Sequence, residues 1–239
     1  MPIYTGLSQV NRKEIIINGK QMQKVYVGDK LVWQKPSAFT AVKYGLLYNW
    51  YAATDVRKIT SSDDWVVPTS TQQTTLAVAA GDSASGIALK ESGTVWWASN
   101  NGTNIYSFNG RGTGHRIAGF DSLRSEAEHW ASNQYNTTMA WNRILQNSTA
   151  SYFQQAYSKY YGLGVRLLYV GSGIPTSYTG SDGKVYGVVR IGSQYWINCN
   201  LAETKYRNGD LIPEVTDNTT WAGLSSGAMC AYNNDWSNV

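Results

Sequence analysis

Tight-turn pairs divide this chain into short apolar runs, and this feature limits its fold more than any other. Asn18-Gly19 and Gly28-Asp29 separate β-rich runs near the beginning, and Gly192-Ser193 interrupts a later one. Asn-Gly between apolar runs is the strongest short-range signal for a β-hairpin. Aromatic residues make up 13% of the chain and charged residues only 15%. This balance favours a loop-rich β protein over a helical bundle.

Residues 1–36 are predicted to form a small separate unit. Its β-rich runs, around 13–17, 22–27 and 31–35, predict a three-stranded meander that ends at Pro36. A meander of this size buries too little surface to be stable alone. It is therefore either a hairpin that packs on the main domain or a unit that docks on a partner, and both interpretations stay open. The candidate docking residues are Ile15, Ile17, Val25, Val27, Leu31 and Trp33.

Two short helices are predicted in the polar and aromatic domain that spans residues 40–239. In "WVVPTSTQQTTLAVAAG", Ser70 and Gln73 have the spacing of a capping box, and Gly81 follows where a helix would end. In "VTDNTTWAGLSSG", Asp217 can cap a second helix that ends by Gly227.

The chain between these helices shows two different patterns. Residues 82–160 are rich in Gly, Asn, Ser and aromatic residues with little periodicity, so long functional loops are expected there. Good strands follow at 162–170 and 183–201, and the second of these is predicted to be a hairpin that turns at Gly192-Ser193.

Several motifs resemble the Fibrobacter succinogenes major paralogous domain, a family with a C-type-lectin-like fold. The second half of that domain is similar to "LLYNWYAATD", "WVVPTSTQQTTL", "ALKESGTVWW", "AWNRIL" and "YGLGVRLL", which lie between residues 46 and 168. Its first half is similar to residues 182–235, so the order of the halves is reversed. The resemblance implies an α+β fold, mostly antiparallel β with two short helices and long loops.

A circular permutation explains the reversed order. Residues 40–170 would be the family's C-terminal half, 171–181 a linker and 182–239 its N-terminal half. The resemblance implies neighbouring first and last strands, so Val239 is expected to end near Val42 to Tyr44, in the same subunit or in a neighbour. The alternative is an incomplete first copy followed by a truncated second copy, but each half alone would leave a sheet edge uncovered.

Catalytic and metal chemistry find little support in the sequence. The histidines, His115 and His129, lie in polar segments with no spacing to a Ser or Cys that suggests a nucleophile and its base. The glycines of "GRGTGHR" at 110–116 indicate a surface turn. Asp63-Asp64 reads as the approach to a helix N-terminus. We therefore expect no enzyme activity, no cofactor and no metal.

A recognition surface is the remaining interpretation of the aromatic and amide-rich stretch. Tyr and Trp give rigid contact area, and small amides and hydroxyls adapt their hydrogen bonds to a ligand. Trp96, Trp97 and Trp141, which lie in or beside family motifs, are expected in the core, and for several tyrosines core and surface are equally open. The candidate ligand surface comprises Tyr106, Arg111, His115, Arg116, Trp130, Tyr135, Asn136, Tyr152 and Tyr157.

Export signals, charge and cysteines bear on location. The beginning of the chain has no basic region followed by an apolar core, and no apolar run is long enough to span a membrane. Cys199 and Cys230 are then expected to be free thiols, although a disulfide stays open. The net charge of +4 is scattered, so nucleic acid is not expected as a partner.

Two functions remain. The first is a phage virion structural protein, a head or tail fibre or decoration, whose lectin-like domain binds a host surface glycan or protein. Its location would be the virion, and its partners other virion proteins and itself, as a homodimer or homotrimer. The second is a bacterial surface adhesin or lipoprotein of the same family. The missing export signal favours the virion.

Overall fold

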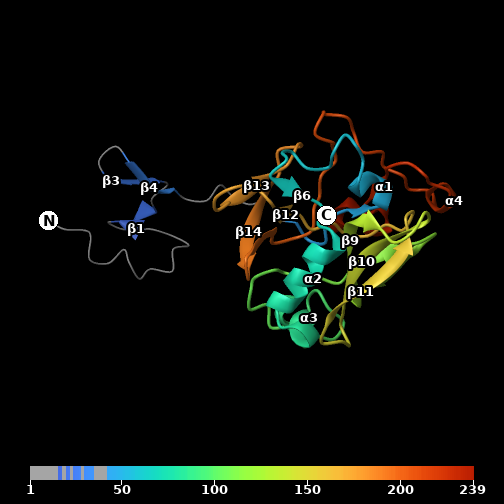
Figure 1. The fold of residues 1–239 in the computed structure, drawn as a ribbon, viewed down its shortest axis with the longest axis horizontal. Helices are drawn as coiled ribbons and strands as arrows, with labels where there is room; N and C mark the ends of the chain where they lie inside the picture. The colour runs from blue at the N-terminus through green and yellow to red at the C-terminus, as the bar shows by residue number, and fades with distance from the viewer. Residues whose placement is uncertain (1–15, 18–19, 22–23, 28–29, 35–41) are drawn as a thin grey trace. The chain divides into compact units, whose positions relative to one another are not determined.

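The computed structural model describes residues 16–17, 20–21, 24–27, 30–34 and 42–239 (Figure 1). The chain divides into two compact units, Met1–Phe39 and Thr40–Val239. Within the described ranges, no helix is both long enough and apolar enough to cross a membrane. The second unit is mostly antiparallel β with a few short helices, which is an α+β architecture.

The first unit contains two antiparallel hairpins instead of one three-stranded sheet. The strands pair β1 with β2 and β3 with β4, and the predicted turn pairs fall between the strands of each hairpin. Of the strand expected over 22–27, the described residues 24–27 form β3. Ile15 lies outside the described residues, as do the side chains of the other candidate docking residues. The strands are β1 (Ile16–Ile17), β2 (Lys20–Gln21), β3 (Lys24–Val27) and β4 (Lys30–Gln34).

A five-stranded sheet occupies residues 113–158, so the prediction of long loops over 82–160 is wrong for this part, whereas residues 90–112 contain no named helix or strand. Its strand order is β11-β10-β9-β7-β8. Some buried positions of these strands carry polar side chains, including Glu128 and Arg143. The sequence therefore lacks the alternation of apolar and polar residues that is typical of a strand. The strands are β7 (Thr113–Arg116), β8 (Phe120–Leu123), β9 (Glu126–Gln134), β10 (Met139–Gln146) and β11 (Tyr152–Ser158).

A second five-stranded sheet has the order β13-β14-β15-β12-β6. The predicted hairpin is confirmed: β14 and β15 pair across a turn in which Gly192 has a φ of +60°. The strand expected over 162–170 is shorter, because only its last part pairs within this sheet. The strands are β6 (Trp65–Val66), β12 (Leu168–Tyr169), β13 (Ser177–Thr179), β14 (Val185–Ile191) and β15 (Gln194–Ile197).

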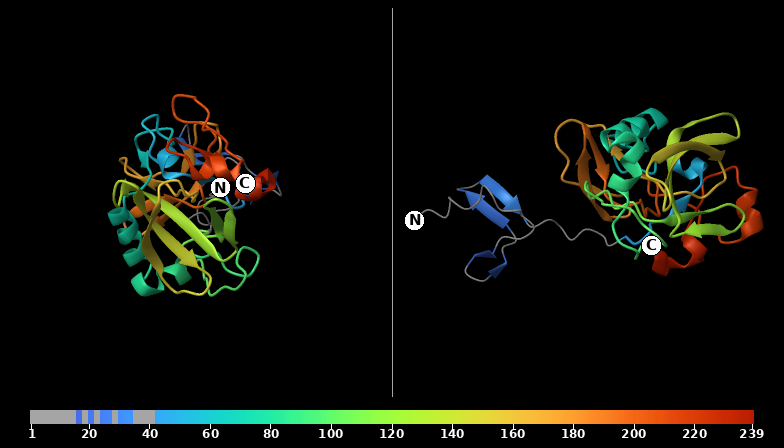
Figure 2. Two further views of the ribbon diagram at one scale, coloured as in Figure 1. Left: turned by 90° about the vertical axis from the view of Figure 1, so that its right-hand side faces the viewer. Right: turned by 90° about the horizontal axis from the view of Figure 1, so that it is seen from below.

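The end of the chain lies beside the beginning of the second unit, within the same molecule. Strand β16 (Met229–Cys230) pairs with β5 (Leu47–Tyr48). Further along, the backbone N–H of Tyr44 donates to the carbonyl of Asn238 at 3.1 Å. Figure 2 shows the C-terminus close to this part of the chain. The expected position of Val239 near Val42 to Tyr44 therefore agrees with the structure.

The longest helix, α2 (Ser70–Ala79), is where the sequence predicts it, but its capping box is one residue earlier. Thr69 accepts from the backbone N–H of Gln72 at 3.2 Å, and the Gln72 side chain accepts from the N–H of Thr69 at 2.8 Å. Helix α4 (Asn218–Ala222) is capped by Asp217 as predicted and ends at Gly223, earlier than expected.

Further short helical segments were not predicted. Helix α1 (Trp50–Ala53) follows β5, and the Asn49 side chain caps it by accepting from Ala52 N at 2.9 Å. The others are α3 (Ser85–Leu89) and the 3₁₀ turns η1 (Asp82–Ala84), η2 (Tyr232–Asn234) and η3 (Trp236–Asn238).

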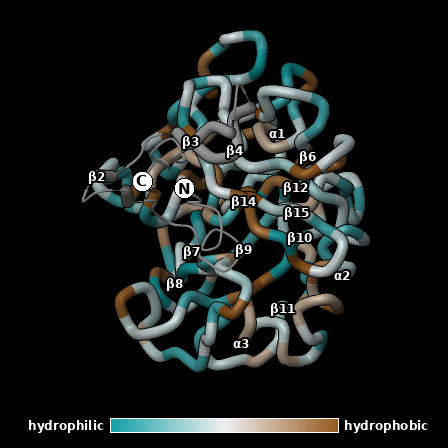
Figure 3. The backbone as a smooth tube through the Cα atoms, turned by 90° about the vertical axis from the view of Figure 1, so that its left-hand side faces the viewer, coloured by the Kyte–Doolittle hydropathy of each residue, from teal (hydrophilic) through white to brown (hydrophobic). Residues whose placement is uncertain are grey.

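The largest apolar cluster draws on both parts of the second unit. Leu46 and Trp130 come from the first part, and Ile197 and Ala231 from the last, and all four are buried together. A second cluster joins α2 to both large sheets. Figure 3 shows hydrophobic and hydrophilic stretches alternating along the chain, which suits many short buried strands. The stretches on either side of residues 171–181 therefore share one core.

Candidate functional site

An open cleft of about 550 Å³ lies where the loop after α1 passes over β6 and the start of α2. Trp65 supplies aromatic surface, and its ring is held between Tyr169 and Tyr178, each with a centroid 5.2 Å away. Val56 and Val170 add exposed apolar groups. Other lining residues are Ala53, Thr54, Asp55, Lys58, Ile59, Thr60, Asp63, Val66, Val67, Thr69, Gln72 and Ser132. The sequence analysis did not predict this cleft.

Asp63 at the cleft is paired with two cations. Its carboxylate lies 2.5 Å from Lys58 Nζ and 2.9 Å from an Arg207 guanidinium nitrogen. These two donors hold the pKa of the Asp63 carboxyl at about 2. Asp63 is therefore a fixed negative charge at neutral pH and a poor proton donor.

Asp55 is similarly paired. Arg57 contacts its carboxylate at 2.9 Å, reaches Asp210 at 3.2 Å and stacks on the Tyr206 ring at 4.0 Å. The hydrogen bond from Arg57 holds the pKa of the Asp55 carboxyl below its usual value. The loop 54–60 is therefore tied to residues 204–212 by charges and backbone hydrogen bonds, among them Arg207 N to Lys58 O at 2.9 Å.

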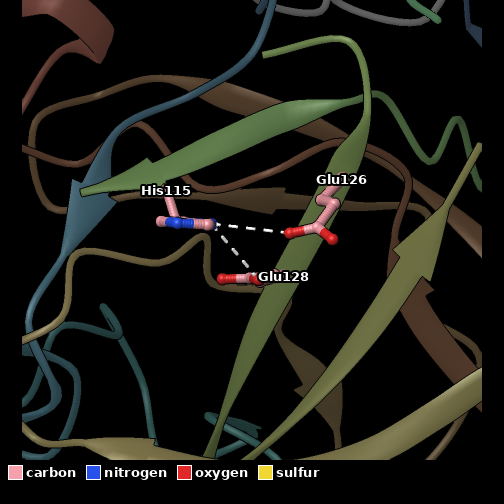
Figure 4. Close-up of side chains that lie close together, drawn as sticks. All are labelled: His115, Glu126 and Glu128. Carbon is pink, nitrogen blue, oxygen red and sulfur yellow. Dashed lines mark ion pairs between the residues drawn. The ribbon is translucent and has the colours of Figure 1, made fainter. Parts of the chain in front are cut away.

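A second cluster of ionisable residues lies on one face of the first sheet. Strands β7 and β9 run parallel and pair at Gly114 and Ala127. Because successive strand residues point to opposite faces, His115 faces the same side as Glu126 and Glu128. Figure 4 shows the imidazole of His115 directed toward both carboxylates.

The His115–Glu126–Glu128 cluster is compact and mostly buried. His115 Nδ1 lies 3.3 Å from a Glu128 oxygen and 3.7 Å from a Glu126 oxygen. The Glu128 side chain has no exposed surface, and 20% of the Glu126 side chain is exposed. Among the described residues, His115 Nδ1 and both Glu128 oxygens find no hydrogen-bond partner. Buried polar groups that lack hydrogen bonds are costly.

Burial and charge oppose each other in the cluster. Burial alone would lower the pKa of His115, but the Glu128, Glu126 and Asp121 carboxylates raise it overall. Burial raises the pKa of the Glu128 carboxyl, although His115 opposes that rise. The half-buried Tyr157, whose pKa is also raised by burial and then by Glu128, lies near the same carboxylate.

Four of the predicted ligand-surface residues are buried, which corrects their assignment. Trp130 donates to the carbonyl of Tyr48 at 2.8 Å, and the Tyr152 hydroxyl contacts His129 Nδ1 at 2.9 Å. Arg116 is fully enclosed and donates to the carbonyls of Val215 and Thr216. His115 is 8% exposed. They are buried because the segment expected to be loops is a sheet.

The other predicted surface residues do not form a single patch around one site. Tyr135 is exposed, and its ring meets Trp141 edge-on at 4.7 Å. Asn136 is a turn residue that accepts from Thr138 N and Met139 N. Tyr106, Arg111 and Tyr157 are half-buried. Of the predicted core tryptophans, Trp97 is buried, and Trp96 and Trp141 are half-buried.

Sequence reasoning missed Glu126 and Glu128. Their spacing of two residues was the available signal, since it places both on one face of a strand. It was not used because residues 82–160 were expected to form loops. The two cysteines are free, as the sequence analysis expected.

Comparison with known proteins adds one finding. No curated protein and no solved structure matches the chain. The Fibrobacter succinogenes major domain (Fib_succ_major) matches residues 9–169, which is well over half of the chain. The match includes the loop over the cleft and the strands that carry His115, Glu126 and Glu128. The chain therefore belongs to the Fibrobacter succinogenes major domain family.

Proposed function

We propose that the chain is a virion structural protein, a head or tail fibre or decoration, that presents a recognition domain to the surface of a host bacterium. The first unit would dock on other virion proteins, and the second would bind a host glycan or protein. The observation that carries the proposal is the open cleft, because a loop laid over a rigid strand and helix is a common binding arrangement.

The charges at the cleft favour binding over catalysis. Asp63 and Asp55 are already paired with cations, and the pKa of each carboxyl is lowered. A general acid or base works best when its pKa lies near the operating pH. These carboxylates are better suited to hold the loop and to accept hydrogen bonds from a ligand.

We also propose that the second unit has a C-type-lectin-like fold with its family halves in swapped order. The support is that β5 and β16 pair and that both halves contribute to the largest apolar cluster. In this interpretation residues 171–181 join the family's old ends, and the new ends lie beside Tyr44.

Ligand binding can be tested with the full chain on a glycan array and on intact host cells. Val56→Arg combined with Val170→Arg places two long side chains at the cleft. Val95→Arg combined with Ile105→Arg alters two similarly exposed residues that do not line it. We expect the first pair to abolish binding and the second to preserve it. Equal binding by both variants would place the ligand elsewhere.

The location is a separate question with its own experiment. Mass spectrometry of purified virions, compared with surface fractions of uninfected cells, should find the chain in the virions. Recovery from the uninfected cell surface would instead support a bacterial adhesin. Light scattering of the purified full chain should give a dimer or trimer, because avidity compensates for weak individual sites.

A further inference from the structure

We propose that His115, Glu126 and Glu128 form a binding site for one divalent transition-metal cation of the Zn²⁺ class, with His115 Nδ1 and one oxygen from each glutamate as ligands. This site is separate from the cleft and does not depend on the proposed recognition function. His115 comes from β7 and the glutamates from β9.

The spacing of the ligand atoms suits such an ion. All three atoms lie within 4.8 Å of one another, and the two distances from His115 Nδ1 are 3.3 and 3.7 Å. Atoms bound to a tetrahedral Zn²⁺ at about 2.0–2.1 Å are separated by about 3.3 Å. The His115–Glu126 distance of 3.7 Å exceeds this value, so the Glu126 side chain, which is partly exposed, would move inward to bind the ion.

Glu128 supplies an independent reason for a ligand. It is fully buried, it points toward His115 (Figure 4), and neither of its oxygens finds a hydrogen-bond partner among the described residues. A charged His115 would neutralise only one of the two carboxylates. A divalent cation would neutralise both carboxylates and bind the atoms of His115 and Glu128 that lack hydrogen bonds.

The same sheet face carries a further unsatisfied group. Asn142 on β10 is buried, and its side-chain oxygen and nitrogen are both without partners among the described residues. It pairs with Trp130, and the next pair on the same face of the sheet, two residues further along, joins Ile144 to Glu128, so Asn142 lies diagonally across from Glu128. Its amide would hydrogen-bond a water on the bound ion.

The donor set selects the kind of ion. One imidazole nitrogen with two carboxylates suits Zn²⁺ and similar ions, whereas Ca²⁺ requires 6–8 oxygen ligands. The bound ion would join β7 to β9, whose direct pairing is the parallel pair Gly114 and Ala127. We therefore assign the ion a structural role in the sheet.

The test is isothermal titration of the tag-free full chain, stripped with a chelator, with ZnCl₂. Wild type should bind one Zn²⁺ per chain, and Co²⁺ in its place should give the visible absorption of a tetrahedral nitrogen and oxygen site. Glu128→Gln and His115→Gln should each weaken binding by roughly 100-fold or more, since even second-shell partners are worth 10–100-fold. Glu214→Gln, an exposed carboxylate outside the cluster, should leave it unchanged.

Circular dichroism of each variant without metal checks that it is folded. If Glu128→Gln is unfolded, Glu126→Gln provides the same test, because a glutamine there can still accept from Gln146. The proposal is overturned if wild type shows no saturable Zn²⁺ binding, if only Ca²⁺ binds, or if a folded cluster variant binds Zn²⁺ as tightly as Glu214→Gln does.

Discussion

Close backbone packing at Gly162 gives a sharp test at the scale of single residues. Gly162 exchanges two backbone hydrogen bonds with Arg116, at 2.8 and 2.9 Å. A Cβ there would lie 2.8 Å from the buried Trp221 ring and 3.1 Å from Arg116 Cβ. We expect Gly162→Ala to lower the free energy of unfolding by about 1–3 kcal/mol, because neither neighbour can move freely. Urea unfolding measures this.

Gly119 is the matched control for that substitution. It lies in the turn between β7 and β8, and a Cβ there would meet no atom within 4 Å. Gly119→Ala should change the free energy of unfolding by less than about 0.5 kcal/mol. Similar losses at the two glycines would contradict the packing argument.

Glu203 makes stability depend on pH. It is fully buried and accepts from the Tyr186 hydroxyl at 3.0 Å and from Asp182 N at 3.1 Å. Burial, with a further contribution from the Asp182 charge, raises the pKa of its carboxyl from 4.5 to about 7. The folded state therefore holds this proton more tightly than the unfolded state does. The stabilisation is complete below about pH 4.5 and is lost as the pH rises through about 7.

The expected loss is up to about 3 kcal/mol in the free energy of unfolding between pH 5 and pH 8. Glu203→Gln keeps a side-chain oxygen that can accept from the Tyr186 hydroxyl or from Asp182 N but has no titratable proton, so this contribution should disappear from the variant. His115, whose pKa is also raised, contributes with the same sign, and therefore the difference between wild type and variant is the quantity to measure. Identical pH slopes in urea unfolding would rule out this role for Glu203.

The start of α2 gives a test at the scale of elements. Thr69→Ala removes the side chain that accepts from Gln72 N, and loss of such a cap costs about 1 kcal/mol. Thr71→Ala, on the exposed face of the same helix, should be neutral or slightly stabilising because alanine favours helix. Thermal unfolding of both variants distinguishes these outcomes. A larger loss for Thr71→Ala would show that the cap lies elsewhere.

The same helix shows how far sequence reasoning reached. Two overlapping capping boxes fit the sequence, Thr69 with Gln72 and Ser70 with Gln73. Contacts from β9 select the first: Ser70 N donates to Asn133, and Gln73 donates to the carbonyls of His129 and Trp130. Local pattern therefore predicted the helix, and tertiary contacts fixed its first residue.

The first large sheet was not predictable in this way. Strand alternation was hidden because β9 and β10 bury Glu128, His129 and Arg143. Arg143 is accommodated by a bond to the Tyr152 carbonyl and by Thr74 Oγ1 at 2.7 Å. Such partners come from distant parts of the chain, so no local window reveals them. The His115 cluster was missed for the same reason, since it requires the pairing of β7 with β9.

At the scale of the whole molecule, one buried network ties the last part of the chain to the rest. Asn200 donates to the carbonyl of Tyr44 at 3.0 Å and accepts from Arg166 Nε at 2.6 Å, and its side-chain oxygen lies 3.0 Å from His129 Nε2. Burial, and then the Arg166 charge, lower the pKa of His129 to about 3, so it is neutral within this network. Contacts of this kind hold the segment after residues 171–181 against the segment before it. They do not depend on the order in which the two segments are joined.

The order of the two halves should therefore be interchangeable in the second unit. A rearranged chain would begin at Ile174, run to Val239, pass through a short Gly/Ser linker to Val42 and end at Gly173. The linker is short because Tyr44 N and Asn238 O are 3.1 Å apart. Breaking the backbone between Gly173 and Ile174 should disturb the packing little, because a Cβ on Gly173 would meet nothing within 4 Å and Ile174 is exposed.

We expect the rearranged chain to unfold cooperatively, with a free energy of unfolding within about 2 kcal/mol of that of residues 42–239 in their natural order, since loop closure changes little with length. A control with the same linker but a break between Ile144 and Leu145 interrupts β10, which pairs with strands on both sides. That control should not fold, because the break exposes buried backbone groups. Urea unfolding followed by tryptophan fluorescence separates the two. Failure of the chain that begins at Ile174 would mean that the order of the halves is fixed by more than their shared core.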